Sequence, residues 1–272
     1  MKPYDWKDKQ VVITGGSTGI GAAFAKELAQ RGAHLVLVAR TESRLRAVAA
    51  ELSGVGHQVI ALDLAKPGAA AQLRDELRAR KVTADVLINN AGFATYGRFG
   101  DTDLATQREE IDLNIGALVE LTHVFLADVV AQKGGVIQVA STAAFQPVPY
   151  LAVYAATKAF VLSFSEALWG EYRREGVRVL ALCPGATDTP FFERVGAEEA
   201  ALGKRAPAAE VVRVALRAFD RNRSYVIQGF ANYIMSHSSR LAPRETTIKL
   251  TTRIMQPRQK PLLPAMSESA KP

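Results

Sequence analysis

The sequence predicts a single α/β domain in which a doubly wound parallel sheet of about seven strands carries helices on both faces. Short apolar runs recur along the chain, and segments with apolar residues at helical spacing separate them. Most of these runs are apolar at consecutive positions, so their side chains must be buried on both sides of a sheet. At 272 residues, of which 48% are hydrophobic, the chain can build a core without a metal or a disulfide.

The strands follow one another with a helical segment between most neighbours. They are expected at residues 10–14, 34–39, 58–63, 85–90, 135–141, 177–183 and 224–229. The first helix follows the first strand and closes on Gly32, a residue suited to the end of a helix. The helices at 113–130 and 152–172 are apolar nearly all round, which predicts one face against the sheet and the other against a partner chain.

The positive charge of the chain is concentrated at its C-terminal end. Residues 237–272 contain seven Lys or Arg and two Glu, a net charge of +5 out of a total of +7. We therefore place a catalytic domain at residues 1–236 and a basic extension at 237–272. A short helix is expected from Pro243, with Ile248, Thr251 and Met255 in one stripe, packed on its own domain or a partner subunit rather than on a membrane. The last stretch holds four prolines and is expected to be disordered.

Cysteine and histidine usage gives no sign of a disulfide or a metal site. The single cysteine, Cys183, lies in an apolar run and is expected to be a core residue. The four histidines are scattered without metal-ligand spacing. The polar N-terminus lacks the pattern of a signal peptide, so a cytoplasmic protein is expected.

A glycine-rich stretch, TGGSTGIG at residues 14–21, lies between the first strand and the first helix. Such a loop can cradle a phosphate, because its backbone N–H groups point at the ligand and no Cβ blocks the approach. Its glycines, Gly15, Gly19 and Gly21, have the spacing GxxxGxG rather than the usual dinucleotide fingerprint GxGxxG. Taken alone, the loop could equally be a tight turn.

Further signals lie where later strands end, the edge at which such sheets bind ligands. NNAG occupies residues 89–92, Ser141 precedes YxxxK by thirteen residues, and Pro184 and Gly185 are followed by Thr189. In this order, the signals resemble the short-chain dehydrogenase/reductase family, in its subgroup of roughly 250 residues, over residues 8 to about 230. The resemblance implies a Rossmann-type fold, a nicotinamide cofactor and assembly into a homodimer or homotetramer.

The YxxxK pair suggests acid–base chemistry. Tyr154 and Lys158 share one helix face, and a neighbouring ammonium is expected to lower the pKa of the phenol below about 10. Tyr154 could then protonate a carbonyl oxygen that receives a hydride, with Ser141 as a second hydrogen-bond donor. The resemblance adds Asn114, which would hold a water linking Lys158 to solvent, and has Lys158 bind the ribose hydroxyls. An isolated YxxxK is more often a packing pattern; the whole ordered set favours catalysis.

The end of the second strand indicates the type of cofactor. An acidic residue there would bind the ribose of NAD, but this chain has Arg40, which can bind a 2′-phosphate. NADP(H) is therefore favoured, with Ser17 as a possible second phosphate contact. The resemblance assigns the cofactor-binding residues as Gly15, Ser17, Thr18, Gly19, Ile20, Arg40, Asp63, Leu64, Asn90, Ala91, Gly92, Tyr154, Lys158, Pro184, Gly185, Thr187 and Thr189.

The loops beyond the strand ends are rich in aromatic and small apolar residues, which predicts a hydrophobic carbonyl substrate, although such loops could equally form a lid packed on their own domain. The resemblance implies the branch of the family that includes ketone, 3-oxoacyl and steroid reductases. The predicted pocket walls are Phe93, Tyr96, Phe145, Tyr150, Phe191 and Phe192, with Arg98 and Arg194 as the nearby cations.

Other classes of function fit the sequence less well. A catalytically silent nucleotide-sensing module is the alternative, and the intact Ser141, Tyr154 and Lys158 argue against it. A nucleic-acid binder would rest on net charge alone. A sugar-nucleotide epimerase would need a different glycine spacing and a substantial second domain.

Overall fold

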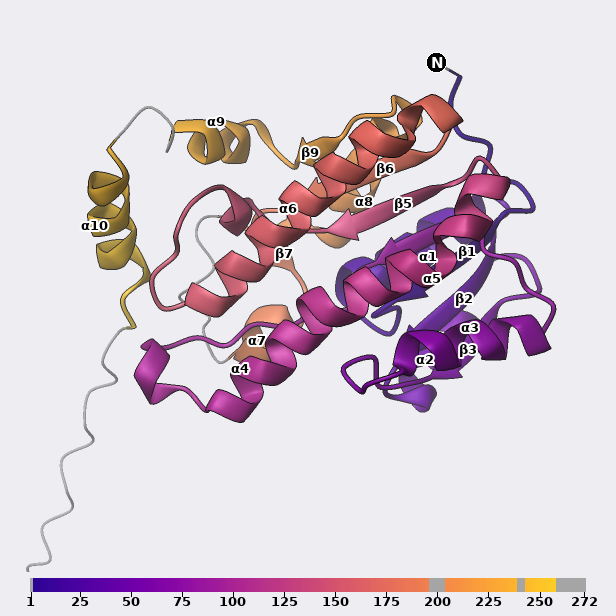
Figure 1. Cartoon of the computed structure of the whole chain (residues 1–272), viewed down its shortest axis with the longest axis horizontal. Helices are drawn as coiled ribbons and strands as arrows, with labels where there is room; N and C mark the ends of the chain where they lie inside the picture. The colour runs from indigo at the N-terminus through magenta and orange to yellow at the C-terminus, as the bar shows by residue number, and fades with distance from the viewer. Residues whose placement is uncertain (1, 196–203, 239–242, 258–272) are drawn as a thin grey trace, which may run out of the picture.

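The computed structural model describes residues 2–195, 204–238 and 243–257, except for the side chain of Arg194. A seven-stranded parallel sheet in the order β3-β2-β1-β4-β5-β6-β9 forms its centre (Figure 1). The strands are β1 (Gln10–Thr14), β2 (His34–Ala39), β3 (Gln58–Ala61), β4 (Val86–Asn89), β5 (Gly135–Val139), β6 (Arg178–Cys183) and β9 (Tyr225–Ile227). This sheet, with helices on both faces, confirms the predicted fold class.

Helices cover the two faces of the sheet in two groups. One group consists of α1 (Gly19–Gln30), α2 (Glu42–Ala50) and α8 (Ala208–Asp220), and the other of α3 (Ala69–Ala79), α5 (Leu118–Ala131) and α6 (Ala152–Tyr172). Successive strand residues point to opposite faces of the sheet. Val11 and Ile13 pack under the first group of helices, whereas Val12 packs under the second. The consecutive apolar residues in the strands are thus explained by two separate cores.

A long helix crosses the second face. It is formed by α4 (Leu104–Ile111), the π-helical turn η2 (Asp112–Ala117) and α5. Among the described residues it is the one helix long and apolar enough, by length and composition, to cross a membrane. Leu121, Phe125 and Val129 are buried in the core under the sheet, so core packing accounts for part of this apolar character.

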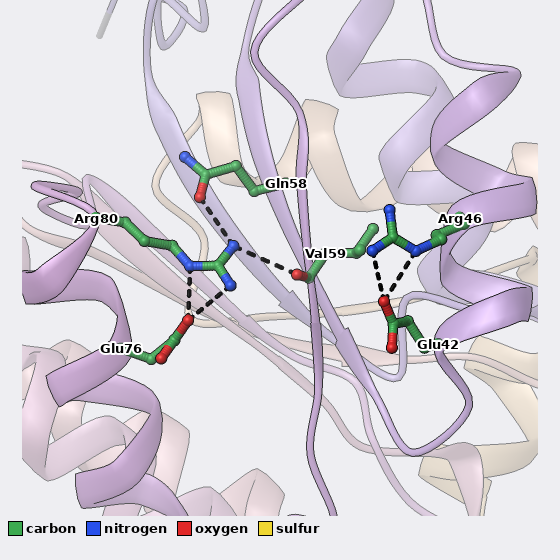
Figure 2. Close-up of polar contacts among 6 residues, drawn as sticks. All are labelled: Glu42, Arg46, Gln58, Val59, Glu76 and Arg80. Carbon is green, nitrogen blue, oxygen red and sulfur yellow. Dashed lines mark hydrogen bonds and ion pairs between the residues drawn. The ribbon is translucent and has the colours of Figure 1, made fainter.

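The edge strand β3 is covered by an arginine. Arg80 Nη1 donates to Gln58 Oε1 at 3.2 Å and to the Val59 carbonyl at 3.4 Å, and Glu76 binds the same guanidinium (Figure 2). On the other side of β3, Arg46 is paired with Glu42. An uncovered strand edge offers backbone groups to other chains, so these contacts protect the sheet from edge-to-edge association.

Shorter elements surround the carboxyl ends of the strands. They are η1 (Phe99–Asp101), η3 (Thr142–Phe145), β7 (Thr187–Asp188), α7 (Phe191–Val195), β8 (Ala206–Pro207), α9 (Phe230–Ser238) and α10 (Arg244–Met255). The short turn η4 (Arg173–Glu175) lies at the opposite end of the sheet, just before β6. Figure 1 shows α10, in yellow, on the side toward which the β5 arrow points. The domain boundary expected after residue 236 falls inside α9. The tail expected to be disordered begins at Gln256, and from residue 258 onward it lies outside the described residues.

Candidate active site

A cavity of about 610 Å³ lies at the carboxyl ends of the central strands. The strand order reverses between β1 and β4, which is where a doubly wound sheet opens a crevice for ligands. Of the predicted catalytic and cofactor-binding residues, all except Asn114 line this cavity. The lining includes Gly15, Ser17, Thr18, Gly19, Ile20, Arg40, Asp63, Leu64, Asn90, Ala91, Gly92, Ser141, Tyr154, Lys158, Pro184, Gly185, Thr187 and Thr189.

Thr14 joins the glycine loop to the end of β4. Its Oγ1 accepts hydrogen bonds from the amides of Asn90 at 2.9 Å and Ala91 at 3.0 Å, and donates to the Ile88 carbonyl at 3.3 Å. Asn90 Nδ2 donates in return to the carbonyls of Thr14 and Gly15. A Cβ on Gly15 would lie 2.7 Å from Asn90 Nδ2, and its φ is +64°, so glycine is required there. The two loops therefore form one unit.

The first turn of α1 lines the cavity beside these two loops through Gly19 and Ile20, and its backbone N–H groups have no partner within the helix. Thr18, at the N-cap, makes no side-chain capping bond, and the first turn has no acidic residue. The partial positive charge of a helix N-terminus favours a bound phosphate. This wall of the cavity therefore fits the phosphates of a dinucleotide.

Ser141 and Tyr154 lie on the opposite wall. Ser141 follows β5, and its Oγ accepts a hydrogen bond from the amide of Ala143 at 3.1 Å, which opens η3. Tyr154 lies in the first turn of α6, where its ring packs against Phe191 with centroids 5.6 Å apart. Packing of η3 against α6 brings the serine and the phenol together.

Lys158 lies one turn after Tyr154 and is 5% exposed. Its Nζ donates to the carbonyl of Val139 at 2.8 Å and lies 5.6 Å from the centroid of the Tyr154 ring. Burial lowers the pKa of Lys158 to about 8, and the negative charge of Glu110 opposes this shift. The geometry brings the predicted pair to one site.

The expected pKa of Tyr154 was wrong in direction. Burial raises it to about 12, hydrogen bonding to Ser141 lowers it, and the charge of Glu110 raises it. The reason is that the Lys158 ammonium is bound to a backbone carbonyl, whereas the phenol is desolvated by its neighbours. Helix spacing predicted that the two residues share a face but could not predict how deeply they are buried.

Asn114 lies behind the cavity rather than on its wall. It sits in the π-helical turn, is 1% exposed, and holds Phe93 through both backbone groups. Phe93 N donates to Asn114 Oδ1 at 3.1 Å, and Asn114 Nδ2 donates to the Phe93 carbonyl at 2.9 Å. A Cβ on Gly92 would lie 2.7 Å from Asn114 Oδ1 and 3.6 Å from Lys158 Nζ. Asn114 and Lys158 therefore both lie close to Gly92, where there is no side chain to separate them.

Comparison with known proteins agrees with this geometry. The family model described as short chain dehydrogenase matches residues 9–200. An uncharacterized oxidoreductase of Staphylococcus epidermidis is 35% identical over 191 residues, which are 69% of this chain and 81% of that protein. The chain belongs to the short-chain dehydrogenase/reductase family. The resemblance identified from the motifs is thereby confirmed.

Two solved structures extend the similarity over nearly the whole chain. A short-chain dehydrogenase from Sphingobium yanoikuyae in complex with NADPH is 34% identical, with a TM-score of 0.76, and the match covers 93% of this chain and 99% of that one. The bulky-bulky ketone specific alcohol dehydrogenase from Comamonas testosteroni is 29% identical, with a TM-score of 0.72 and coverage of 92% and 95%.

Arg40 stands at the rim of the cavity of this short-chain dehydrogenase/reductase. Its side chain is 63% exposed, and Nη1 contacts Glu109 Oε1 at 3.2 Å. Thr41 and Arg44 line the cavity beside it. Asp63 Oδ1 accepts a hydrogen bond from the amide of Ala65, which orients the loop after β3.

The aromatic residues expected to form the substrate pocket divide into two sets. Phe93, Phe191 and Phe192 line the cavity. The prediction was wrong for Phe145, whose ring packs on Tyr225 at 6.0 Å, because η3 turns it away from the cavity.

Tyr96 and Tyr150 are also absent from the described lining. Their rings lie 6.4 Å apart, and both pack behind the wall in the cluster that contains Val148, Leu151 and Met255. The pocket is therefore more aliphatic than the sequence predicted.

The two arginines expected near the pocket are not found in its described lining. Arg98 is exposed and lies outside the lining residues. The side chain of Arg194 lies outside the described part of the chain.

The C-terminal helices complete the cavity. A contribution from the segment at residues 229–235, which forms most of α9, was expected from the sequence, whereas that of α10 was not. Met235 of α9 and Thr251 and Met255 of α10 line it, and Tyr96 Oη donates to the Met255 carbonyl at 2.8 Å. The stripe of Thr251 and Met255 was visible in the sequence, but nothing there indicated which surface it covers.

Proposed function

We propose that this protein is an NADPH-dependent oxidoreductase that transfers hydride between the nicotinamide and a carbonyl or secondary alcohol of a hydrophobic substrate. The observation that carries the proposal is that Ser141, Tyr154 and Lys158 line one cavity together with the glycine loop. A silent nucleotide-sensing module would have no need of this arrangement.

The roles of the catalytic residues follow from their chemistry. The bound cofactor would supply or accept the hydride. Negative charge then develops on the substrate oxygen, where the Tyr154 phenol donates a proton and the Ser141 hydroxyl donates a second hydrogen bond. The buried Lys158 ammonium, which lies 5.6 Å from the centroid of the Tyr154 ring, would bind the ribose. Asn114 holds the loop at Phe93 and would position the water that returns a proton to Lys158.

Selectivity for NADP(H) is proposed to come from Arg40. No carboxylate stands at the end of β2, and a guanidinium can bind a 2′-phosphate through two parallel hydrogen bonds. Ser17 and Arg44 line the same part of the cavity and would add contacts. The similar Sphingobium protein, solved with NADPH, supports the choice.

The substrate is proposed to be a bulky hydrophobic ketone or its alcohol. Described residues on the substrate side are mostly apolar: Phe93, Val148, Leu151, Phe191, Phe192, Val195, Met235 and Met255. Each methylene buried against them would add about 0.8 kcal/mol, so catalytic efficiency should rise about fourfold per added carbon until the pocket is full. A homologous series of alkyl and aryl ketones would measure this slope; a flat series would argue against an apolar wall.

We also propose a cytoplasmic homodimer or homotetramer formed through α5 and α6. The outward face of α6 is exposed and built mainly from small residues, which permit close approach of a second helix. Phe160 lies on this face, 39% exposed and stacked on Phe164. Mass determination in solution would test the assembly, and a strictly monomeric protein would contradict it.

The catalytic proposal is tested with Tyr154→Phe. The variant keeps the ring and its packing on Phe191, so NADPH affinity should change little. Turnover with ketones should fall about a hundredfold or more, because the proton donor is lost. Cofactor oxidation and fluorescence titration measure the two quantities. Turnover within threefold of the wild-type rate would refute the role of Tyr154.

A further inference from the structure

A buried carboxylate, that of Glu110, lies behind the cavity. Glu110, in α4, is 0% exposed and lies one helical turn before Asn114. Its Oε2 accepts hydrogen bonds from Thr95, from the amide at 2.9 Å and from the hydroxyl at 2.7 Å. Its Oε1 is buried and has no hydrogen-bond partner among the described residues.

Glu110 and Asn114 hold the same loop. Asn114 binds the backbone of Phe93, and Glu110 binds Thr95 two residues later. Glu110 and Asn114 are four residues apart and therefore share one face of the helix. Together they bind the loop that leaves β4 at two positions, Phe93 and Thr95. Gly92 and Phe93, which line the cavity, belong to this segment.

One oxygen of Glu110 is left over after this anchoring. Burying a carboxylate is costly unless an opposite charge or a full set of hydrogen bonds compensates it. The buried cation nearby is Lys158, which belongs to α6, a helix packed directly against α4. The Lys158 ammonium and the Asn114 amide both lie close to Gly92, since a Cβ there would be 3.6 Å and 2.7 Å from them, and Asn114 is one helical turn from Glu110.

We propose that Glu110 is a positioning residue of the reaction centre, which fixes the Phe93–Thr95 segment with one carboxylate oxygen and balances the buried Lys158 ammonium with its charge. The catalytic role of Glu110 rests on the proposed function, whereas its interaction with the Lys158 charge does not. A neutral acceptor such as glutamine would bind Thr95 equally well, so the anchoring alone does not require a charged residue.

The electrostatics agree with this geometry. The groups that face Glu110 are Thr95 from the loop and Lys158 and Tyr154 from α6, and Cys183 of β6 acts on the same lysine. Burial raises the pKa of Glu110, while the Thr95 hydrogen bonds and the Lys158 charge lower it. The Glu110 charge in turn raises the pKa of Lys158 and of Tyr154. Loss of that charge should therefore lower both.

Glu110→Gln tests the charge separately from the shape. Glutamine keeps an oxygen that can accept from Thr95. The measurement is competitive chemical labelling of the Lys158 amine against pH in protein without cofactor. We expect the midpoint to fall by about one pH unit. In the active enzyme, the alkaline loss of ketone reduction should move to lower pH in the same direction, because both Lys158 and Tyr154 lose protons more readily.

Thr95→Val is the matched control. It removes one hydrogen bond to Glu110 and keeps the charge, so it should lower the thermal midpoint without moving the Lys158 titration. A Glu110→Gln midpoint equal to that of the wild type would overturn the proposal and leave Glu110 a loop anchor only. Since labelling needs neither cofactor nor turnover, this outcome is distinct from failure of the proposed function.

A double-mutant cycle in thermal stability tests the same coupling without labelling; in otherwise wild-type protein, Glu110→Gln should lower the thermal midpoint. In a Lys158→Met background the Glu110 charge has lost its partner, so Glu110→Gln should raise the thermal midpoint instead of lowering it. Equal effects of Glu110→Gln in the two backgrounds would overturn the coupling.

Discussion

Replacement of Arg40 by aspartate should convert the cofactor preference. In the structure, Arg40 stands at the rim of the cavity with its guanidinium held by Glu109 at 3.2 Å. A charge-assisted contact to a phosphate contributes about 1.5–3 kcal/mol, and a carboxylate in its place adds repulsion. Because the side chain is 63% exposed, we expect a loss of about 2–4 kcal/mol, a weakening of NADPH binding by about 30- to 800-fold. NADH has no 2′-phosphate, so its affinity should change less than about threefold.

The ion pair with Glu109 supplies a matched variant. Glu109 competes with a phosphate for the guanidinium, and an exposed pair of this kind contributes about 0.2–1 kcal/mol. Glu109→Gln should therefore tighten NADPH by up to about fivefold and leave NADH unchanged. Fluorescence titration of both cofactors against the two variants and the wild type is the assay. If Arg40→Asp weakens both cofactors equally, or if the wild type prefers NADH, Arg40 does not read the 2′-phosphate.

Two further predictions concern the loop clamp and the pocket wall. Thr14→Val leaves two backbone amides without their acceptor, at a cost of about 1–3 kcal/mol each. The free energy of unfolding measured in urea should therefore fall by about 2–5 kcal/mol, whereas that of Thr14→Ser should stay close to wild type. A loss below about 0.5 kcal/mol would mean that the hydrogen bonds of Thr14 are dispensable. Phe191→Ala should raise KM for a bulky ketone about tenfold through lost apolar contact, whereas Phe145→Ala, whose ring faces Tyr225, should not. A larger KM effect at Phe145 would contradict the observed orientation of η3.

The sheet and the cofactor wall were predictable because their determinants are local. A buried parallel strand needs consecutive apolar residues, and the next residues along the chain are carried to the cavity by the direction of the strand. Ser141, Asn90 and Gly185 all reach the site in this way. Tyr154 and Lys158 needed only helix spacing.

The features that escaped prediction depend on contacts between distant parts of the chain. Met255 lies 159 residues from Tyr96, which binds its carbonyl, and no periodicity relates the two. Phe145 was assigned to the cavity because its loop borders the cavity, yet the turn of η3 decides where the ring points. Glu110 was not predicted as a site residue because an acidic residue in an amphipathic helix is expected to be exposed to solvent, and the sequence does not show which loop buries it.

The most direct test of hydride transfer follows deuterium from the cofactor to the product. NADPH carrying deuterium at the transferable C4 position is mixed with the protein and a bulky aryl ketone, and the alcohol formed is examined by mass spectrometry, with Tyr154→Phe as the control. The proposed function predicts an alcohol one mass unit heavier than the one formed with unlabelled NADPH, with the label on the carbinol carbon, and little product from the variant. An alcohol without label, or no alcohol from any ketone of the series while NADPH still binds, would contradict it.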